Sequence, residues 1–186
     1  KLKENDIGNT NPSHFRSCYI ESKRCGEAIV NAYRKKGYNA KSARLCLAYG
    51  PGVKKDDNRV LNEFIKKGML SKKITISGGE KNTRAYIYIT DAIKMLTNIL
   101  FFSKENVYNV GGNQKISILG LAKLIAEELK VSFINKKDKK NNQGAPNHVQ
   151  INIDKYKKEF GNLKFTSIKK GLYKTIEWHK KIITTK

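Results

Sequence analysis

Tyr19 and Lys23 form the pair of residues in this sequence with the clearest capacity for chemistry. They stand four positions apart in a segment whose apolar periodicity predicts a helix ending at Gly37. Residues four apart on a helix share a face, so the phenol and the ammonium are expected to point to one region of space. An ammonium beside a phenol favours the phenolate, which makes a phenol usable as a general base near neutral pH. The spacing alone is common on solvated helices, so its meaning depends on the rest of the chain.

The helix that carries this pair is predicted to follow Ser13, a residue suited to capping a helix N-terminus. Small and apolar residues recur in it at steps of three and four and predict a buried stripe. The stripe consists of Phe15, Cys18, Ser22, Cys25, Ile29 and Ala32. Tyr19 and Lys23 lie beside the stripe and not opposite it. We therefore expect the pair to line a cleft.

The formal net charge of +22 allows two interpretations. One is a polyanionic partner, such as nucleic acid or an acidic membrane. The other is a surface on which lysine fills the exposed positions. Six of the 38 basic residues are arginines, the type suited to bidentate phosphate contacts, and the lysines are scattered along the chain. We expect no nucleic-acid and no membrane partner, and a basic polyanion-binding module remains the alternative from another functional class.

The three cysteines, Cys18, Cys25 and Cys46, show no Cys-x-x-Cys spacing. Cys18 and Cys25 are predicted to be small buried residues of the helix stripe. The three histidines are isolated from one another and from the cysteines, so we expect no disulfide framework and no metal site. The sequence contains no signal peptide and no apolar run near 18 residues, which predicts a soluble cytoplasmic protein.

Strand, turn and helix patterns alternate along the rest of the chain and predict an α/β fold. Strands are expected at 39–47, 74–77, 84–89 and 107–110, helices at about 59–68, 91–102, 118–129, 154–160 and 167–183, and a polar loop at 135–150. Ser117 is expected to cap the helix at 118–129. In α/β folds sites collect at the carboxyl ends of strands, which here means the turn Tyr49-Gly50-Pro51-Gly52.

Several motifs follow one another in an order that covers nearly the whole chain. They are Tyr19-Ile20-Glu21-Ser22-Lys23, Ala43-Arg44-Leu45-x-x-Ala48-Tyr49-Gly50-Pro51-Gly52, Asp57-Asn58-Arg59-Val60, Asn82-Thr83-Arg84-Ala85-Tyr86-x-Tyr88-Ile89-x-Asp91, Val107-Tyr108-Asn109-Val110-Gly111 and Gly171-Leu172-x-x-Thr175-Ile176-Glu177-Trp178. With these motifs the chain resembles the C-terminal part of the extended short-chain dehydrogenase/reductase family, which comprises NAD-dependent sugar-nucleotide epimerases, dehydratases and decarboxylases. Within that family it looks most like the UDP-glucuronate decarboxylases.

The resemblance implies the C-terminal part of a Rossmann-like doubly wound fold plus a small mixed α/β substrate-binding domain. Residues 1–50 would end the Rossmann-like domain and carry the catalytic helix. Residues 51–186 would form mainly the substrate-binding region, with strands and helices that return to the core domain. The resemblance also implies a homodimer that pairs the helix containing Tyr19 and Lys23 with its copy.

The resemblance assigns roles to five residues. Tyr19 would take a proton from a sugar hydroxyl while the sugar carbon gives a hydride to NAD, which yields a 4-keto sugar intermediate. Lys23 would hold the nicotinamide ribose. Arg59 resembles a position near the cofactor and the sugar, and Arg84 resembles the arginine that binds the nucleotide diphosphate. Tyr33 matches a tyrosine that reaches substrate in the decarboxylases, and its helical position suits a core role equally well.

The sequence also departs from the family pattern. Leu47 stands where many members carry asparagine, Glu63 stands where decarboxylases tend to have asparagine, and 148–150 lacks the arginine that completes the nucleotide pocket. The family's Gly-rich cofactor turn and its upstream Ser or Thr would precede Lys1, so we expect these 186 residues alone to be inactive. A non-catalytic relative that keeps only the sugar-nucleotide pocket is a second alternative.

Overall fold

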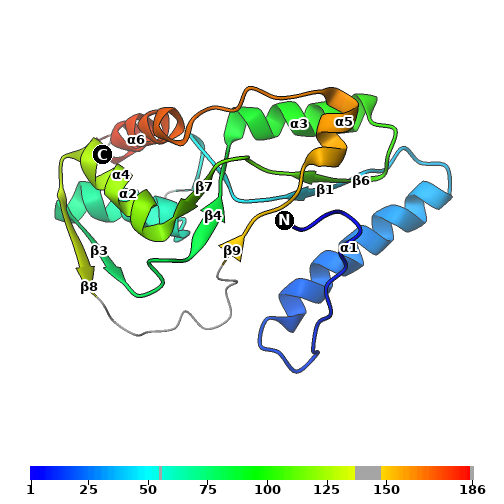
Figure 1. Ribbon diagram of the computed structural model, residues 1–186, viewed down its shortest axis with the longest axis horizontal. Coiled ribbons are helices and arrows are strands. Elements are labelled where there is room, and N and C mark those ends of the chain that lie inside the picture. Colours follow the sequence, from blue (N-terminus) through cyan, green and yellow to red (C-terminus); the bar gives the residue numbers. More distant parts are fainter. Residues whose placement is uncertain (55, 137–147, 185–186) are drawn as a thin grey trace.

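The computed structural model describes residues 1–54, 56–136 and 148–184, which fold as a mixture of helices and short strands (Figure 1). The helices are α1 (Ser17–Lys35), α2 (Val60–Ser71), α3 (Ile89–Phe102), α4 (Ile118–Leu129), α5 (Asp154–Phe160) and α6 (Ile168–Thr184). The strands are β1 (Ser42–Leu45), β2 (Ala48–Tyr49), β3 (Lys73–Ser77), β4 (Thr83–Ala85), β5 (Ile87–Tyr88), β6 (Val107–Val110), β7 (Lys115–Ser117), β8 (Ser132–Lys136) and β9 (His148–Val149).

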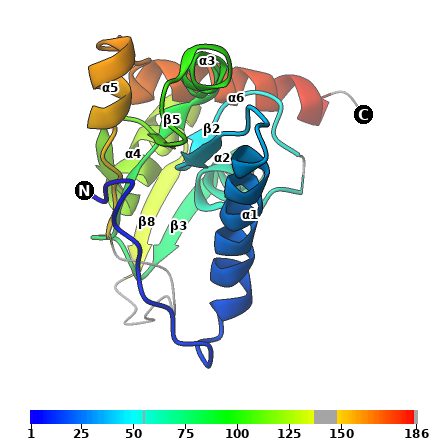
Figure 2. The ribbon, with the colours of Figure 1, turned by 90° about the vertical axis from the view of Figure 1, so that its right-hand side faces the viewer.

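Parallel pairing dominates the strands. β1 pairs with β6 from Ser42↔Val107 to Leu45↔Val110, and β2 pairs with β5 in the same sense. β3 pairs in parallel with β8, and the two strands lie side by side in Figure 2. β4 lies between β7, which is antiparallel to it, and β9, which is parallel. Parallel neighbours require crossover connections that usually contain helices, so the predicted α/β class is confirmed.

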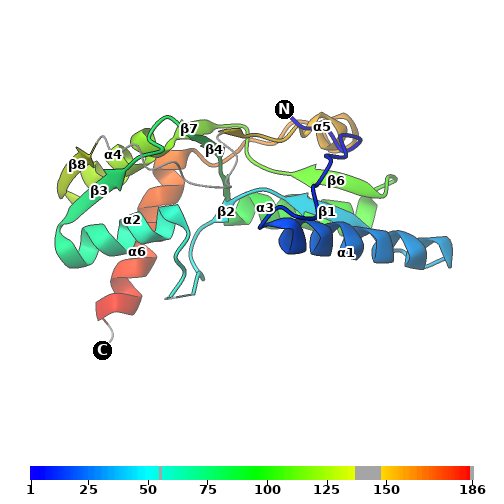
Figure 3. The same cartoon turned by 90° about the horizontal axis from the view of Figure 1, so that it is seen from below.

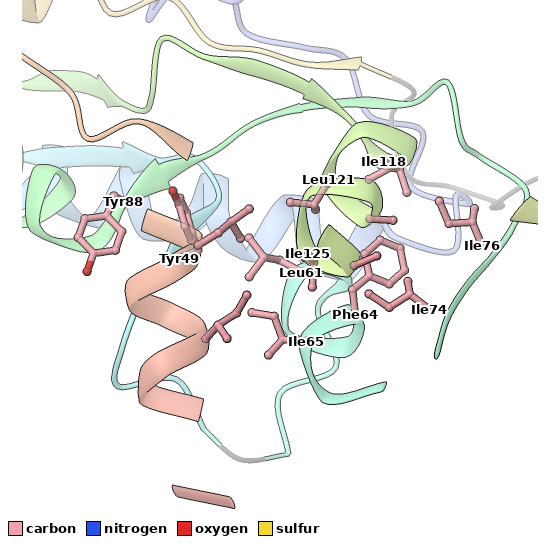
Figure 4. Close-up of a cluster of buried hydrophobic side chains, with 14 residues drawn as sticks. Tyr49, Leu61, Phe64, Ile65, Ile74, Ile76, Tyr88, Ile118, Leu121 and Ile125 are labelled. Carbon is pink, nitrogen blue, oxygen red and sulfur yellow. The ribbon is translucent and has the colours of Figure 1, made fainter. Parts of the chain in front are cut away.

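Two hydrophobic clusters stabilise the described chain. The first lies between α2, α4, α6 and β3, where residues such as Ile65, Leu121 and Ile176 are fully buried (Figure 4). The second lies where α3 and α5 pack on β1 and β6, around Met95, Tyr108 and their neighbours. Complete burial of one large aliphatic side chain stabilises a fold by about 1.5–3 kcal/mol. These clusters therefore fix α2 and β6 as rigid elements next to which a site can be built.

The first residues of the chain are joined to β6 and β1. Glu4 is buried, and its Oε1 accepts a hydrogen bond from the backbone N–H of Asn109 at 2.9 Å. The side-chain Nδ2 of Asn109 donates to the carbonyl oxygens of Leu2 at 3.0 Å and Asn152 at 2.9 Å. Arg44 donates through Nη1 to the carbonyl oxygen of Glu4 at 2.8 Å. Segments that are far apart in sequence therefore meet at one asparagine.

The structure corrects two expectations about the first helix. α1 begins at Ser17 with Arg16 as its N-cap residue, so Ser13 does not cap it. None of the residues of α1 is buried, and Cys18 and Cys25 are exposed, so the prediction of a buried stripe is wrong for the described chain. Periodicity predicts a helix correctly, but burial depends on which elements pack on it. In Figure 3 α1 extends to the right-hand end of the molecule, next to β1.

Two further boundaries differ from the expectation. The single strand predicted at 84–89 is two short strands, β4 and β5, interrupted at Tyr86. The loop predicted at 135–150 begins inside β8 and ends with β9, and residues 137–147 lie outside the described residues. By contrast, β6 and α5 have the predicted bounds, and Ser117 caps α4 by accepting a hydrogen bond from Gly120 N at 2.9 Å.

Within the part of the chain that the structure describes, no helix combines the length and the apolar character that crossing a bilayer requires. The same residues contain no group of three or more side chains placed to hold a metal ion.

His179 gives the first cluster a pH dependence. This histidine of α6 is 1% exposed, and neither ring nitrogen has a hydrogen-bond partner in the described chain. Burial lowers its pKa, the charge of Lys66 lowers it further, and Asp57 opposes them. The unfolded chain, with a histidine pKa of about 6.5, therefore binds the proton more readily than the folded chain. The contribution of neutral His179 to stability is therefore fully present above about pH 6.5 and decreases as the pH falls below that value.

We expect His179→Phe to remove the loss of stability at low pH that His179 causes. The free energy of unfolding, measured in urea between pH 7.5 and 5, should decrease less steeply in the variant, by up to about 1.4 kcal/mol per pH unit. His14→Gln, at an exposed histidine, is the control and should keep the wild-type pH profile. Identical profiles for wild type and His179→Phe would show that His179 does not titrate on unfolding.

Candidate active site

α1 presents Tyr19 and Lys23 on one face, as their spacing predicts. The ammonium nitrogen of Lys23 lies 5.6 Å from the centre of the Tyr19 ring, and the guanidinium carbon of Arg16 lies 5.5 Å from the same centre. The Tyr19 side chain is 58% exposed, so its hydroxyl is open to a ligand. Two cations therefore lie within cation–π distance of one exposed phenol ring. This arrangement suits a group that accepts a proton from a ligand hydroxyl.

A charged hydrogen-bond pair attaches α1 to β1. Arg44 donates to Glu27 through Nε at 2.9 Å and through Nη2 at 2.6 Å, a bidentate geometry. The hydrogen bonds from Arg44 lower the pKa of Glu27, while partial burial opposes them. Glu27 is two turns beyond Tyr19 on α1, so this pair fixes the helix that carries the phenol. Arg24 adds a hydrogen bond to the carbonyl oxygen of Gly8 at 2.7 Å.

The charges of Arg59 and Arg84 both affect a tyrosine, Tyr86, that was not among the candidate residues. Arg59 precedes α2 as its N-cap residue, and Arg84 lies in β4. Burial raises the pKa of Tyr86 to about 12, and the charges of Arg84 and Arg59 oppose that rise. Two arginines 25 positions apart in sequence thus act on one phenol. The signal for Tyr86 in the sequence was its place in the motif that also contains Arg84.

The end of β2 and the turn that follows it pack against Tyr86 and Tyr88. Tyr49 is 6% exposed, and its ring packs edge-on against Tyr86 at 5.8 Å and Tyr88 at 5.6 Å between ring centres. Gly50 follows with φ of 152°, and a Cβ there would lie 2.4 Å from Cγ2 of Ile89. Only glycine fits this turn without strain. Burial raises the pKa of Tyr49, so it remains a neutral packing group.

The structure does not bring all of the predicted residues together. Figures 1 and 3 place α1 toward one end of the molecule and α2 toward the other. Tyr33 lies 14 residues beyond Tyr19 on α1, which corresponds to about 21 Å along the helix axis. It is 53% exposed and packs against Tyr38 with 5.5 Å between ring centres. Tyr33 is therefore neither beside Tyr19 nor in a core.

The described residues thus offer two kinds of chemistry. The pair on α1 offers a phenol that accepts a proton and an ammonium that donates hydrogen bonds. Arg59 and Arg84 offer two guanidinium groups, which suit the oxygens of phosphates and carboxylates.

Comparisons with known proteins agree with this chemistry. Residues 2–111 match the model of a family described as the NAD dependent epimerase/dehydratase family. UDP-glucuronic acid decarboxylase 1 of Xenopus tropicalis is 30% identical over 179 residues, which cover 94% of this chain and 41% of that protein. The chain therefore spans about two fifths of the length of that relative.

Solved structures share the fold. UDP-glucuronic acid 4-epimerase of Bacillus cereus, solved with UDP-glucuronic acid and NAD, superposes with a TM-score of 0.77 at 25% identity, over 95% of this chain and 58% of that one. A GDP-L-fucose synthetase of Naegleria fowleri reaches a TM-score of 0.82 at 17% identity, over 99% and 66% of the two chains. The second likeness concerns the fold alone. The family match covers more than half of the chain and agrees with the motif order, so this chain belongs to the NAD-dependent epimerase/dehydratase family.

Proposed function

We propose that the full-length protein is an NAD-dependent sugar-nucleotide epimerase, dehydratase or decarboxylase that acts through a 4-keto sugar. The observation that carries the proposal is the exposed phenol of Tyr19 with the ammonium of Lys23 beside its ring, on a helix that the family match includes. UDP-glucuronate is the first substrate to test, because the names of two of the similar proteins described above, a decarboxylase and a 4-epimerase, contain this compound.

Tyr19 and Lys23 would act on the sugar end of the substrate. The Tyr19 oxygen would accept the proton of a sugar hydroxyl, because its phenol is exposed on the face of α1 that also carries Lys23. Lys23 would donate hydrogen bonds to ribose hydroxyls of the cofactor. Proximity of phenol and ammonium on one rigid helix keeps both groups oriented for this step.

Arg84 and Arg59 would act on the charged part of the substrate. A diphosphate carries negative charge on both phosphates, and the planar guanidinium fork binds such oxygens with two hydrogen bonds. We assign the diphosphate to Arg84, and the cofactor and sugar to Arg59. Tyr33 has no role in this proposal because of its distance from Tyr19 along α1.

The described residues fit one part of NAD. An exposed hydroxyl and an exposed ammonium one helical turn apart provide partners for a ribose. The family's Gly-rich turn, on which the pyrophosphate of the cofactor rests at a helix N-terminus, has no equivalent in this sequence. When bound, NAD would accept a hydride from the sugar carbon and later return it. Tyr19, Lys23 and Arg59 are the residues of this chain that we assign to it.

We further propose the domain organisation and the assembly. Residues 1–50 would end a Rossmann-like domain, and residues 51–186 would form mainly the substrate-binding region. The protein would be a homodimer through α1, since Phe15, just before this helix, is 69% exposed and Ile29, on it, is 52% exposed, and both offer apolar surface. Sedimentation of the full-length protein and of Ile29→Asp measures this: the wild type should be a dimer and the variant should dissociate. A monomeric wild type would refute the dimer.

The experiment that tests the function uses the full-length protein, NAD and UDP-glucuronate, followed by proton NMR of the sugar signals. Turnover to a decarboxylated pentose or to the 4-epimer is the expected result and also assigns the net reaction. The 186-residue chain alone should show no turnover. Absence of turnover by the full-length protein with UDP-glucuronate, UDP-glucose and dTDP-glucose would refute the proposal, and polyanion binding that collapses with salt would favour the basic binding module.

A further inference from the structure

Arg59 is held along one edge of its guanidinium. Its Nε donates to Asp57 at 2.8 Å from Oδ2 and 3.1 Å from Oδ1, and its Nη2 lies 2.8 Å from Oδ2. The backbone N–H of Arg59 also donates to Oδ1 of Asp57 at 2.9 Å. Both the side chain and the main chain of Arg59 are therefore fixed by one carboxylate. A guanidinium has five N–H donors, so the Nη1 group is left for another acceptor.

Asp57 is fixed in turn by α2. Nδ2 of Asn62 donates to Oδ1 of Asp57 at 3.0 Å, and the Asn62 side chain is 4% exposed. One turn further along α2, the ammonium of Lys66 donates to Oδ1 of Asn58 at 3.2 Å. Residues four apart on a helix share a face, so Asn62 and Lys66 hold the segment before α2 from one side. The buried Asn62 belongs to the first hydrophobic cluster's helix, which gives this attachment a rigid base.

The charge states match this geometry. Hydrogen bonds from Arg59, then from Asn62, lower the pKa of Asp57 to about 2, while burial opposes them. Asp57 therefore stays ionised throughout the neutral range. The Asp57 side chain is 16% exposed and that of Arg59 is 59% exposed, so the carboxylate is sheltered and the guanidinium faces solvent. The charge of Arg59 nevertheless reaches Tyr86, beside Arg84.

We propose that Asp57 and Asn62 are positioning residues that hold Arg59 by its Nε edge, so that its remaining N–H groups bind an anionic group of the ligand. This inference rests on the proposed function, because it takes a sugar nucleotide as the ligand. It goes beyond that function in assigning two residues that do not touch the ligand. The opposite arrangement, in which Asp57 competes with the ligand for Arg59, makes a different prediction.

The first measurement needs no ligand. Proton exchange at Nε of Arg59, observed by NMR in the full-length protein, should be slow in the wild type. It should be at least about tenfold faster in Asp57→Ala, which removes the carboxylate that accepts from Nε, and faster in Asn62→Leu, which removes the hydrogen bond that orients this carboxylate. Glu177→Gln is the matched control: it breaks an exposed ion pair with Lys180 of 2.7 Å on α6 and should leave the exchange unchanged.

The second measurement is the dissociation constant of UDP-glucuronate by calorimetry, in a Tyr19→Phe background that prevents turnover. Asp57→Ala should weaken UDP-glucuronate binding by about tenfold, the loss expected for one hydrogen bond to a charged group. In an Arg59→Ala background the further change Asp57→Ala should have almost no effect, because the two residues act as one unit. Asp57 lies outside the hydrophobic clusters, so this cycle remains decisive if Asn62→Leu does not fold.

The outcomes separate this inference from the proposed function. Tighter UDP-glucuronate binding by Asp57→Ala would overturn the inference and identify Asp57 as a competitor. Fast exchange at Arg59 Nε in the wild type would overturn it whatever the ligand. Slow exchange that both variants accelerate, in a protein that binds no UDP-glucuronate, would support the positioning role of Asp57 and Asn62 and refute the sugar-nucleotide ligand.

Discussion

Tyr19→Phe should lower kcat of the full-length protein by about 10²–10⁴-fold with UDP-glucuronate, the range that general acid–base groups contribute. The phenyl ring keeps the contact with Lys23 and loses the oxygen that accepts the proton. The dissociation constant of UDP should stay within about twofold of the wild type, because the proposed diphosphate residue, Arg84, lies in β4 and not on α1. Single-turnover kinetics with calorimetry for binding measure both quantities.

Tyr38→Phe is the matched control for this experiment. Tyr38 is 61% exposed, close to the 58% of Tyr19, and it is not in the proposed site. Its replacement should leave kcat unchanged. If Tyr19→Phe retained more than about one tenth of the wild-type kcat, the phenol would not be the base and the proposed mechanism would fail.

Gly112→Ala should lower the free energy of unfolding by more than about 3 kcal/mol, beyond the usual cost of overpacking. A Cβ at this position would lie 1.9 Å from the carbonyl oxygen of Tyr86 and 2.8 Å from its carbonyl carbon. Those atoms belong to the backbone between β4 and β5, so they do not move aside as a flexible side chain would. Urea denaturation measures the effect.

Gly26→Ala is the control for the same substitution in open space. A Cβ at Gly26 meets no atom within 4 Å, and the residue lies inside α1. We expect a gain of about 0.5–1 kcal/mol, because alanine loses less conformational entropy in a helix. Equal stability of Gly112→Ala and wild type would contradict the close approach of residue 112 to the strand before α3.

Local features of the fold were predictable from the sequence and pairings across long distances were not. β6 and α5 have the predicted bounds, and Ser117 caps α4, because strand periodicity and capping depend on adjacent residues. β8 was missed because its sequence, Ser-Phe-Ile-Asn-Lys, is half polar and its partner β3 lies about 60 positions earlier. The burial of α1 was predicted wrongly because the sequence of a helix does not identify the elements that cover it.

The candidate site shows the same difference between local features, which the sequence predicts, and long-range contacts, which it does not. The geometry of Tyr19 and Lys23 follows from the helical repeat, so the sequence predicted it. The effect of the Arg59 charge on Tyr86 depends on the route of the chain through α2 and β3, so no local pattern reveals it. Motif order identified both arginines but did not identify Asp57 and Asn62 as the residues that hold one of them.

Asn109 has a consequence for the order of folding. Its side chain joins the carbonyl oxygen of Leu2, 107 positions earlier, to that of Asn152, 43 positions later. Closing loops of this length costs conformational entropy before the hydrogen bonds of Asn109 can form and offset that cost. We expect the terminal segment to dock on β6 as a late kinetic phase, which the time course of protection of the Asn109 amide during refolding would measure.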